Sequence, residues 1–435
     1  LRVARSVPPR AQPLRAPIAT APPAQASPAQ ALPAAAAAPL HARDAPDKCT
    51  EPPCAAETCG PLRAATSTLS RAIQVDGLSG LRTAVGRDEE LFVTFANSAL
   101  APFVSNLLSS LARHGVSNLL VGALDPGMYA GCVAACVPVV RIDAQNGAAP
   151  SSAAYIRKDY AAFKRVGLLK IRFLSTLLSA APHLAGIWVC DADVTFLRHP
   201  AAELVSGAPA LAAADVLLST DCLDLEADAR GECANNAQFN TGILYLRARP
   251  ATSSFVRQWS ERMENAGADP WLDDQAVLND LVRQQLRQLP PLTANNRTDG
   301  GSRTYAAAGG GVTIGLVPLL RVANGHTYFV QHRCAMRAAK CTAHLHETTG
   351  GAVAARSSMS HGMLCDASCA EALPVAVHST YQYGDTARFA YGKRDRLMQA
   401  GLWHEWPYLV RPPGSHADAA TARESTDERF IVLDE

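Results

Sequence analysis

Short apolar runs that stop at a polar residue recur through the middle of the chain. They are rich in Val, Ile, Leu and Phe, and several of them close at Asp or Asn. Short runs that are apolar almost throughout are typical of strands buried inside a sheet. We therefore predict strands over residues 91–97, 118–125, 137–143, 187–190, 215–221, 239–247, 312–320 and 375–383.

Between these runs, apolar residues recur at helical spacing. Helices are predicted over residues 103–111, 160–178, 255–263 and 271–282, and a shorter one near residues 66–75. Asp273 is placed to cap the helix that follows it. Strands that alternate with helices in this order predict an α/β protein with a mostly parallel, doubly wound sheet.

The ends of the chain and one internal stretch lack this pattern. Residues 1–47 are rich in Pro and Ala without any period, which predicts a disordered stem. Residues 48–87 form a transitional segment with three cysteines, and residues 332–373 are interpreted as a cysteine-bearing insertion. The tail after residue 412 is polar and expected to be flexible, so we expect one ordered domain over residues 88–412.

The charge balance excludes one class of partner. The net charge is +1, and only 18% of the residues are charged, without a basic stripe that could follow a nucleic acid. No apolar run reaches the length of ~18 residues that a membrane span requires. Because the chain begins at Leu1, we expect a processed form or fragment, with any signal or membrane anchor upstream.

Twelve cysteines indicate an oxidising compartment. They lie mostly in close groups: Cys49, Cys54 and Cys59; Cys132 and Cys136; Cys222 and Cys233; Cys334 and Cys341; Cys365 and Cys369. No group has zinc-finger spacing with histidines, so disulfides are favoured over zinc. Cys190, inside a predicted strand, is expected to be a buried free thiol. A glycosylation sequon at Asn296 agrees with this compartment.

Two carboxylates one residue apart follow the strand that ends at Cys190. Asp191 and Asp193 would be costly to desolvate at the end of a buried strand without a positive partner. A hard divalent cation meets that need, because Mg²⁺ and Mn²⁺ prefer oxygen ligands. The carboxyl ends of strands in open α/β sheets are also where such folds bind ligands. The same pattern occurs by chance in solvated loops, so the rest of the chain must supply the context.

Other polar residues stand near strand ends or on adjoining helices. They are Thr94, Asn97, Asp125, Lys170, Asp221, Asn240, Thr241, Asp274, Gln275, His378 and Lys393. Each also has a structural explanation. Asn97 could cap a helix, and Asp125 before Pro-Gly is typical of a turn. Lys170 could be solvated, and His378 could be a core histidine.

Several motifs occur in a fixed order: DADVTFLRHP, FNTGILYLR, DDQAVLND, HTYFVQ and VHSTYQYGDTARFAYGKRDRLMQAGLW. This series resembles glycosyltransferase family 77, the nucleotide-diphospho-sugar transferases. It is most similar to plant and algal arabinosyltransferases that build short arabinans on hydroxyproline-rich cell-wall proteins. The resemblance covers residues 88–410 and implies a GT-A-like fold. The insertion over residues 332–373 and the long spacer at residues 384–391 depart from the pattern.

The resemblance implies roles for these residues. Asp193 and His378 would ligate Mn²⁺ or Mg²⁺, and Asp191 would contact the ion, its water or the donor ribose. Lys393 and Lys170 would lie near the donor diphosphate. The uridine would be lined by Thr94, Asn97 and Asp125. The sugar and acceptor would be faced by Asn240, Thr241, Asp274 and Gln275.

The reaction implied is transfer of L-arabinofuranose from its UDP donor, with retention, onto hydroxyproline-linked arabinosides. A covalent route needs a carboxylate, with Asp274 the first candidate and Asp273 the next. Front-face attack needs neither. The resemblance also implies that the protein works in the Golgi lumen of the secretory pathway and that its full-length form is anchored in the membrane. Alternatives are a xylosyl- or galactosyltransferase on the same scaffold, a non-catalytic glycan-binding relative, and a structural cell-wall protein, which the ordered core disfavours.

Overall fold

A computed structural model of the chain describes residues 60–142, 160–267, 269, 272–284, 286–288, 303–307, 311–331, 374–380 and 389–404. Four predicted features lie outside the described residues: the stem, the insertion over residues 332–373, the tail and the sequon at Asn296.

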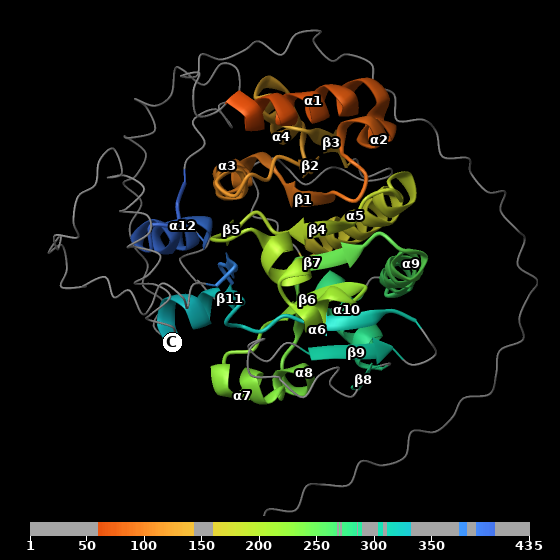
Figure 1. The fold of residues 1–435 in the computed structure, drawn as a ribbon, viewed down its shortest axis with the longest axis vertical. Helices are drawn as coiled ribbons and strands as arrows, with labels where there is room; N and C mark the ends of the chain where they lie inside the picture. Colours follow the sequence, from red (N-terminus) through yellow and green to blue (C-terminus); the bar gives the residue numbers. More distant parts are fainter. Residues whose placement is uncertain are drawn as a thin grey trace, which may run out of the picture. The chain divides into compact units, whose positions relative to one another are not determined.

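A single large sheet carries most of the predicted strands (Figure 1). Its order is β3-β2-β1-β4-β7-β6-β10-β9-β8, and all strands except β7 and β9 run in the same direction. The prediction of an α/β protein with a mostly parallel sheet is therefore confirmed. The strands are β1 (Glu90–Ala96), β2 (Leu119–Ala123), β3 (Val139–Arg141), β4 (Gly186–Cys190), β6 (Val216–Thr220), β7 (Phe239–Arg247), β8 (Leu286–Gln288), β9 (Arg303–Ala307) and β10 (Thr313–Leu316).

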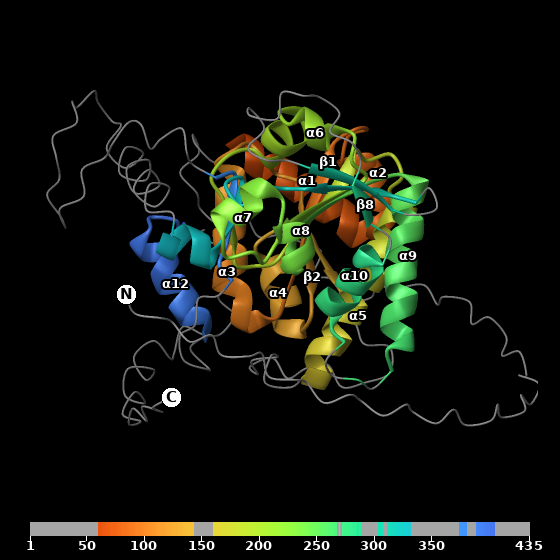
Figure 2. The ribbon, with the colours of Figure 1, turned by 90° about the horizontal axis from the view of Figure 1, so that it is seen from below.

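Helices cover both faces of this sheet, because side chains along each strand alternate between the faces. In β4, Ile187 and Val189 enter one core cluster, whereas Trp188 and Cys190 enter another. Figure 2 places α5, α9 and α10 on one side and α3 on the other. The first face packs on α1 (Gly60–Asp76), α2 (Leu81–Ala84), α5 (Tyr160–Ala180), α9 (Pro250–Asn265) and α10 (Asp274–Arg283); the second packs on α3 (Ala101–Ala112), α6 (Pro209–Ala212) and the π-helix η4 (Ala201–Ser206).

A second, three-stranded sheet has the order β11-β12-β5. It consists of β5 (Val194–Phe196), β11 (Val322–Asn324) and β12 (Ala376–His378). The expected strand over residues 375–383 is thus shorter than predicted and belongs to this smaller sheet. The chain leaves the large sheet after Cys190 and re-enters extended structure at Val194, which pairs with His378.

The amino-terminal part contributes more to the core than its sequence suggested. The helix expected near residues 66–75 extends over the whole of α1, and its side chains Leu69 and Ile73 are buried in the main core. Leu81 and Val85 join them. The remaining helices are η1 (Gly77–Gly80), η2 (Ser98–Leu100), α4 (Pro126–Ala134), α7 (Leu225–Arg230), α8 (Cys233–Asn236), η5 (Thr327–Gln331) and α12 (Phe389–Gln399).

Five of the twelve cysteines lie in the described residues. Cys222 and Cys233 form a disulfide, and Cys190 is a buried thiol, as predicted. Cys132 and Cys136, in contrast, are not disulfide-bonded. Cys132 lies in the core with its Sγ 3.6 Å from Met128 Sδ, and burial raises its pKa to about 12. Among the described residues, no helix is both long and apolar enough to cross a membrane.

Candidate active site

Five strands deliver polar residues to one edge of the large sheet. The strands β1, β2, β4 and β6 end there, so Asn97, Asp125, Asp191 and Asp221 follow them at that edge. β7 runs antiparallel to β4 and β6, so its first residues lie at the same edge. This direction brings Asn240 to Asp221, which follows β6, and brings the Thr241 carbonyl to Lys170, the partner of Asp191. The edge is the usual ligand-binding region of an open α/β sheet.

Asp191, Asp193 and His378 form a compact group. One ligand atom from each lies within 4.8 Å of the others, an arrangement that could hold a metal ion. His378 Nε2 is 3.3 Å from Asp193 Oδ1 and 3.6 Å from Asp191 Oδ2. The ring is only 5% exposed, but it faces carboxylates instead of apolar side chains. The alternative of an ordinary core histidine therefore does not describe it.

Backbone contacts fix the three members of this group. The Asp191 amide donates to the Gly242 carbonyl over 2.7 Å, which ties the turn after β4 to β7. His378 is opposite Val194 in the small sheet, so the strand after Asp193 places the imidazole beside it. A side chain at Gly242 would overlap the His378 ring. The glycine of the FNTG motif thus makes room for the histidine.

Two buried lysines pair with the two aspartates. Lys170 Nζ, on α5, is 3.2 Å from Asp191 Oδ1, 3.7 Å from Asp274 Oδ2 and 3.2 Å from the Thr241 carbonyl oxygen. Lys393, on α12, contacts Asp193. Lys170 is 7% exposed, so it is not a solvated surface lysine. Each carboxylate of the DAD motif therefore has a cationic partner from a helix: Lys170 from α5, which directly precedes β4, and Lys393 from α12, 200 residues after Asp193.

These pairs shift the protonation equilibria. Burial would raise the pKa of Asp193, but the charge of Lys393 and the contacts with His378 hold it well below its usual range. Burial would lower the pKa of Lys170, but Asp191 and Asp274 raise it above its usual value. The pKa of Asp274 is raised by burial, which its single lysine contact only partly offsets. Lys170 therefore stays charged, and Asp274 is the less compensated carboxylate.

Asp273 and Asp274 have different environments. Asp273 caps α10, as predicted, by accepting a hydrogen bond from the Ala276 amide over 2.8 Å. Asp274 is 6% exposed and points to Lys170. A Cβ atom on Gly167 of α5 would lie 3.1 Å from Asp274 Cβ, so the absence of a side chain there lets α10 approach α5 closely.

Asp221 organises the residues on the other side of β7. Its Oδ1 accepts from Asn240 Nδ2 over 2.8 Å, and its Oδ2 accepts from Gln275 Nε2 over 2.9 Å. The Gln275 Oε1 in turn accepts from the Thr241 amide over 3.2 Å. The sequence marked Asp221 only as an acid at a strand end, and gave it no role. Its position after the run over residues 215–221 was the available signal.

The three residues expected near uridine differ in their bonding. Thr94 Oγ1 and Asn97 Oδ1 are buried and have no hydrogen-bond partner among the described residues. Asn97 precedes η2 without a side-chain capping bond, so capping does not account for it. Asp125 caps α4 through the Met128 amide over 2.7 Å and also accepts from the amide and hydroxyl of Ser98 over 2.9 Å each. Its carboxylate thus organises the loop around Asn97.

Solved glycosyltransferase structures are similar at low identity. Galactosyltransferase LgtC in complex with donor and acceptor sugar analogues is 13% identical, with a TM-score of 0.36, over 72% of this chain and 95% of that one. The apo form of mouse xyloside xylosyltransferase 1 is 9% identical, with a TM-score of 0.31, over 68% of this chain and 98% of that one.

Sequence comparisons point to one family. Arabinosyltransferase XEG113 of Arabidopsis thaliana is 26% identical over 333 residues, which are 75% of this chain and 42% of that protein. Arabinosyltransferase RRA1 of the same plant is 24% identical over 211 residues, 46% of this chain and 49% of that protein. The chain thus spans less than half the length of these relatives. A family model described as nucleotide-diphospho-sugar transferase matches residues 114–397, more than half of the chain. The chain therefore belongs to the nucleotide-diphospho-sugar transferases of glycosyltransferase family 77.

Proposed function

We propose that the protein is a metal-dependent, retaining glycosyltransferase that moves L-arabinofuranose from a UDP donor onto hydroxyproline-linked arabinosides. The observation that carries this proposal is the group formed by Asp191, Asp193 and His378 at the ligand-binding edge of the sheet. Family membership supports the nucleotide-sugar donor. The choice of sugar rests on the relatives described as arabinosyltransferases.

The donor set fits a manganese or magnesium ion. Two carboxylates from the turn between β4 and β5 and one imidazole from β12 converge, and Mn²⁺ accepts both ligand types together. Asp193 and His378 would hold the ion, and Asp191 would hold it directly or through water. When bound, the ion neutralises charge on the departing diphosphate. The exposed part of the Asp191 side chain, 36%, leaves one side of the group open for a donor.

The lysines are the natural partners of the diphosphate. Lys170 and Lys393 lie against the two aspartates, and with a donor bound they would pair with its phosphate oxygens. Thr94 Oγ1 and Asn97 Oδ1 would accept hydrogen bonds from the uridine. Asp125 would position the loop around Asn97 through its hydrogen bonds with Ser98. The sugar would be faced by Asn240, Thr241 and Gln275 on the opposite side of the group.

Asp274 is the favoured carboxylate for a covalent route. It is buried and lies 3.7 Å from Lys170, whereas the Asp273 carboxylate is occupied in capping α10. On a covalent route Asp274 would bond to the anomeric carbon as UDP departs, and the acceptor hydroxyl would then displace it. In front-face attack, Asp274 would only orient the sugar while the leaving phosphate oxygen takes the acceptor proton.

The cellular setting is proposed from the same relatives. We place the enzyme in the secretory pathway, in the Golgi lumen, where the Cys222–Cys233 disulfide would persist. In this arrangement residues 1–47 serve as a stem, and the catalytic domain covers residues 88–412 together with α1 and α2, which pack into its core. An anchor would lie upstream of the present chain.

A donor panel tests the proposal. UDP release is measured with UDP-arabinofuranose, UDP-xylose and UDP-galactose, with Mn²⁺ or with EDTA, and with a hydroxyproline arabinoside as acceptor. We expect Mn²⁺-dependent release from UDP-arabinofuranose. Release only from UDP-xylose or UDP-galactose would select a different sugar on the same scaffold. No release from any donor would favour a non-catalytic glycan-binding relative.

A substitution tests the metal assignment. Asp193→Ala should lower UDP release by at least ~10³-fold while the far-UV circular dichroism stays unchanged, because it removes both a ligand and the partner of Lys393. Asp280→Ala, at an exposed position on α10, is the matched control and should keep full activity. Full activity of the Asp193→Ala variant would refute the assignment.

A further inference from the structure

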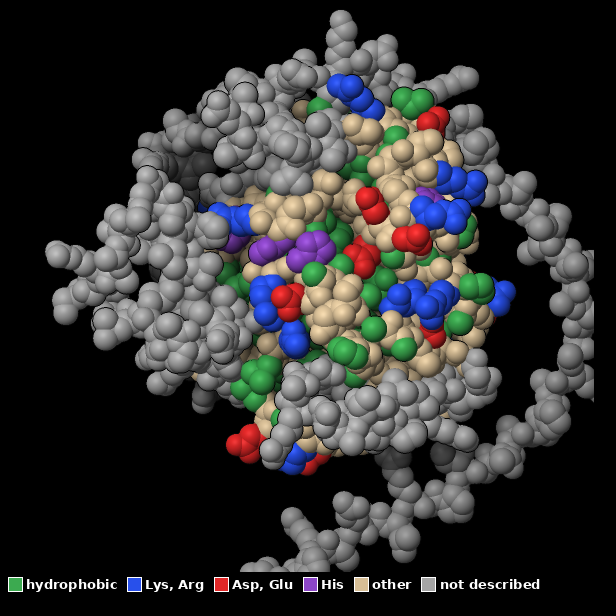
Figure 3. All heavy atoms as spheres, in the orientation of Figure 1, with side chains coloured by type: hydrophobic (Ala, Val, Ile, Leu, Met, Phe, Trp, Pro, Cys, Tyr) green, Lys and Arg blue, Asp and Glu red, His purple; other side chains and the backbone are tan. Residues whose placement is uncertain are grey.

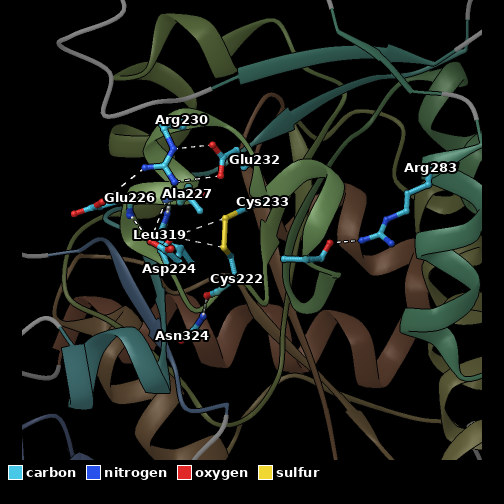
Figure 4. The surroundings of a disulfide bond; sticks show 12 residues. Cys222, Asp224, Glu226, Ala227, Arg230, Glu232, Cys233, Arg283, Leu319 and Asn324 are labelled. Atoms are coloured by element: carbon cyan, nitrogen blue, oxygen red, sulfur yellow. Dashed lines mark hydrogen bonds and ion pairs between the residues drawn. A yellow bond between two sulfur atoms is a disulfide. The ribbon is translucent and has the colours of Figure 1, made fainter. Parts of the chain in front are cut away.

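The segment that joins β6 to β7 is held in a fixed shape. It begins at Asp221, contains the short helices α7 and α8, and is closed by the disulfide between Cys222 and Cys233 (Figure 4). The Cys222 carbonyl accepts a hydrogen bond from Asn324 Nδ2 over 2.6 Å, and Asp228 accepts one from the Leu319 amide over 2.8 Å. A loop anchored at both ends and in its middle can present a preformed binding surface.

This loop encloses a hollow of about 430 Å³, which we call the α7–α8 pocket. It is lined by Asp221, Leu223, Ala227, Asn236 and Gln238 and by the disulfide. The volume falls within the range of about 300–1,000 Å³ that is typical of ligand sites. The pocket is therefore large enough for a small ligand and is built on a rigid frame.

The pocket adjoins the candidate active site through Asp221. Asp221 lines the pocket, and its carboxylate accepts hydrogen bonds from Asn240 and Gln275. Gln275 Nε2 lies 3.1 Å from Gln238 Oε1, a second residue of the pocket wall. The same Gln275 accepts from the Thr241 amide, and the Thr241 carbonyl accepts from Lys170. A ligand in the pocket would thus sit next to the residues that face the donor sugar.

The side chains that line the pocket favour uncharged ligands with hydroxyl groups. Asp221 and the side-chain amides of Asn236 and Gln238 suit hydroxyl groups, while Leu223, 41% exposed, offers an apolar surface for the C–H face of a sugar. Among the described lining residues there is no lysine or arginine, and there are two carboxylates, Asp221 and Asp224. This charge balance favours a neutral glycan and disfavours phosphorylated or uronic-acid ligands.

We propose that the α7–α8 pocket binds the acceptor as a short, neutral oligosaccharide, with its reactive end directed past Asp221 toward the donor sugar. This inference rests on the proposed function for the identity of the donor site, but it concerns a separate binding event. It gives the β6–β7 loop a purpose that the metal group alone does not explain.

A steric block tests the pocket. In Asn236→Trp, at an exposed position on α8, an indole would enter the pocket without disturbing the core. Isothermal titration with a hydroxyproline-linked tri-arabinoside, in the presence of UDP and Mn²⁺, should give a Kd at least tenfold weaker than that of the unmodified chain. Gln238→Ala, which removes a polar group from the wall, should weaken binding in the same direction.

Two controls make the outcome decisive. Asn235→Trp places the same ring on the neighbouring exposed residue, which does not line the pocket, and should keep the Kd within twofold. A tri-galacturonide should bind at least tenfold more weakly than the neutral glycan. Equal affinities for the Asn236→Trp and Asn235→Trp variants, or no binding by the unmodified chain, would overturn the inference.

The two proposals can fail separately. A chain that transfers sugar, but whose Kd is insensitive to Asn236→Trp, retains the proposed function and loses the pocket. A chain that binds the neutral glycan in a manner sensitive to Asn236→Trp, but releases no UDP from any donor, retains the pocket and loses the proposed function.

Discussion

At the scale of single residues, the site depends on close contacts that only particular side chains allow. Gly242 is the clearest case, because a side chain there would occupy the space of the His378 ring. The Gly242 carbonyl also receives the Asp191 amide. One small residue in the FNTG motif thus sets the positions of two members of the proposed metal group.

The substitution Gly242→Ala tests this dependence. The added methyl group should displace the imidazole, so Mn²⁺ affinity should fall about 10–100-fold, in line with changes to residues that orient metal ligands. Binding is measured by titration followed by electron paramagnetic resonance. Gly131→Ala, in α4, is the control, because a Cβ there would meet nothing within 4 Å. Equal Mn²⁺ affinity in both variants would contradict the steric argument.

At the scale of elements, α5 supports the site with three residues on one face. Lys164, Gly167 and Lys170 are spaced three apart, so they point in similar directions. Lys164 Nζ donates to the carbonyls of Ala266, Gly267 and Asp269 over 3.2, 2.8 and 2.7 Å. The helix thereby holds the segment between α9 and α10, which leads directly to the Asp273–Asp274 pair.

Removal of the Lys164 amino group should therefore alter the position of Asp274. In Lys164→Met the three carbonyls lose a buried donor, which should cost about 1–3 kcal/mol of stability in urea unfolding. If the segment positions Asp274, kcat should also fall about tenfold with little change in the donor KM. Arg165→Met, exposed on the same helix, should change neither quantity. A stability loss with unchanged kcat would leave Lys164 a purely structural residue.

Most strands and the polar residues at their ends could be predicted from the sequence pattern. The directions of the strands and the ion pairs between distant residues could not. The strand runs and their polar ends predicted the edge at which Asp191 and Asp221 meet, whereas Asn240 reaches this edge because β7 runs in the opposite direction. The reversed direction of β7 was not predictable, because an apolar run reads the same in either orientation. The small sheet was missed because strands of three residues, such as β5 and β12, carry too little pattern. The pairing of Lys170 with Asp274 joins residues more than a hundred positions apart.

At the scale of the whole molecule, the net charge is close to zero. Acidic and basic side chains are interspersed over the described part of the face in Figure 3, which agrees with the net charge of +1. The partly buried carboxyl of Glu90 has a markedly raised pKa. Glu90, at the start of β1, has its pKa raised from 4.5 to about 7 by burial, against the opposing charge of Arg247.

This carboxyl should make global stability depend on pH. Its folded-state pKa lies above the unfolded value, so the fold binds the proton more tightly and loses stability as pH rises from about 4.5 to 7. Glu90→Gln should therefore raise the stability at pH 8 by up to about 3 kcal/mol, and have little effect at pH 4.5. Thermal unfolding at both pH values measures this. Glu261→Gln, exposed on α9, should show no such difference. A Glu90→Gln gain that is equal at both pH values would contradict the assignment.

The reversal of β7 has a consequence for engineering. Because β6 ends and β7 begins at the same edge, the loop between them leaves and returns at nearly one place, with Asp221 and Asn240 in contact across its base. Such a loop can be exchanged as a unit without shifting the strands that carry it. Replacing residues 222–237 with the corresponding loop of another family member, with Gln238 kept as the partner of Gln275, should then change the acceptor preference and leave the metal group and the donor side as they are.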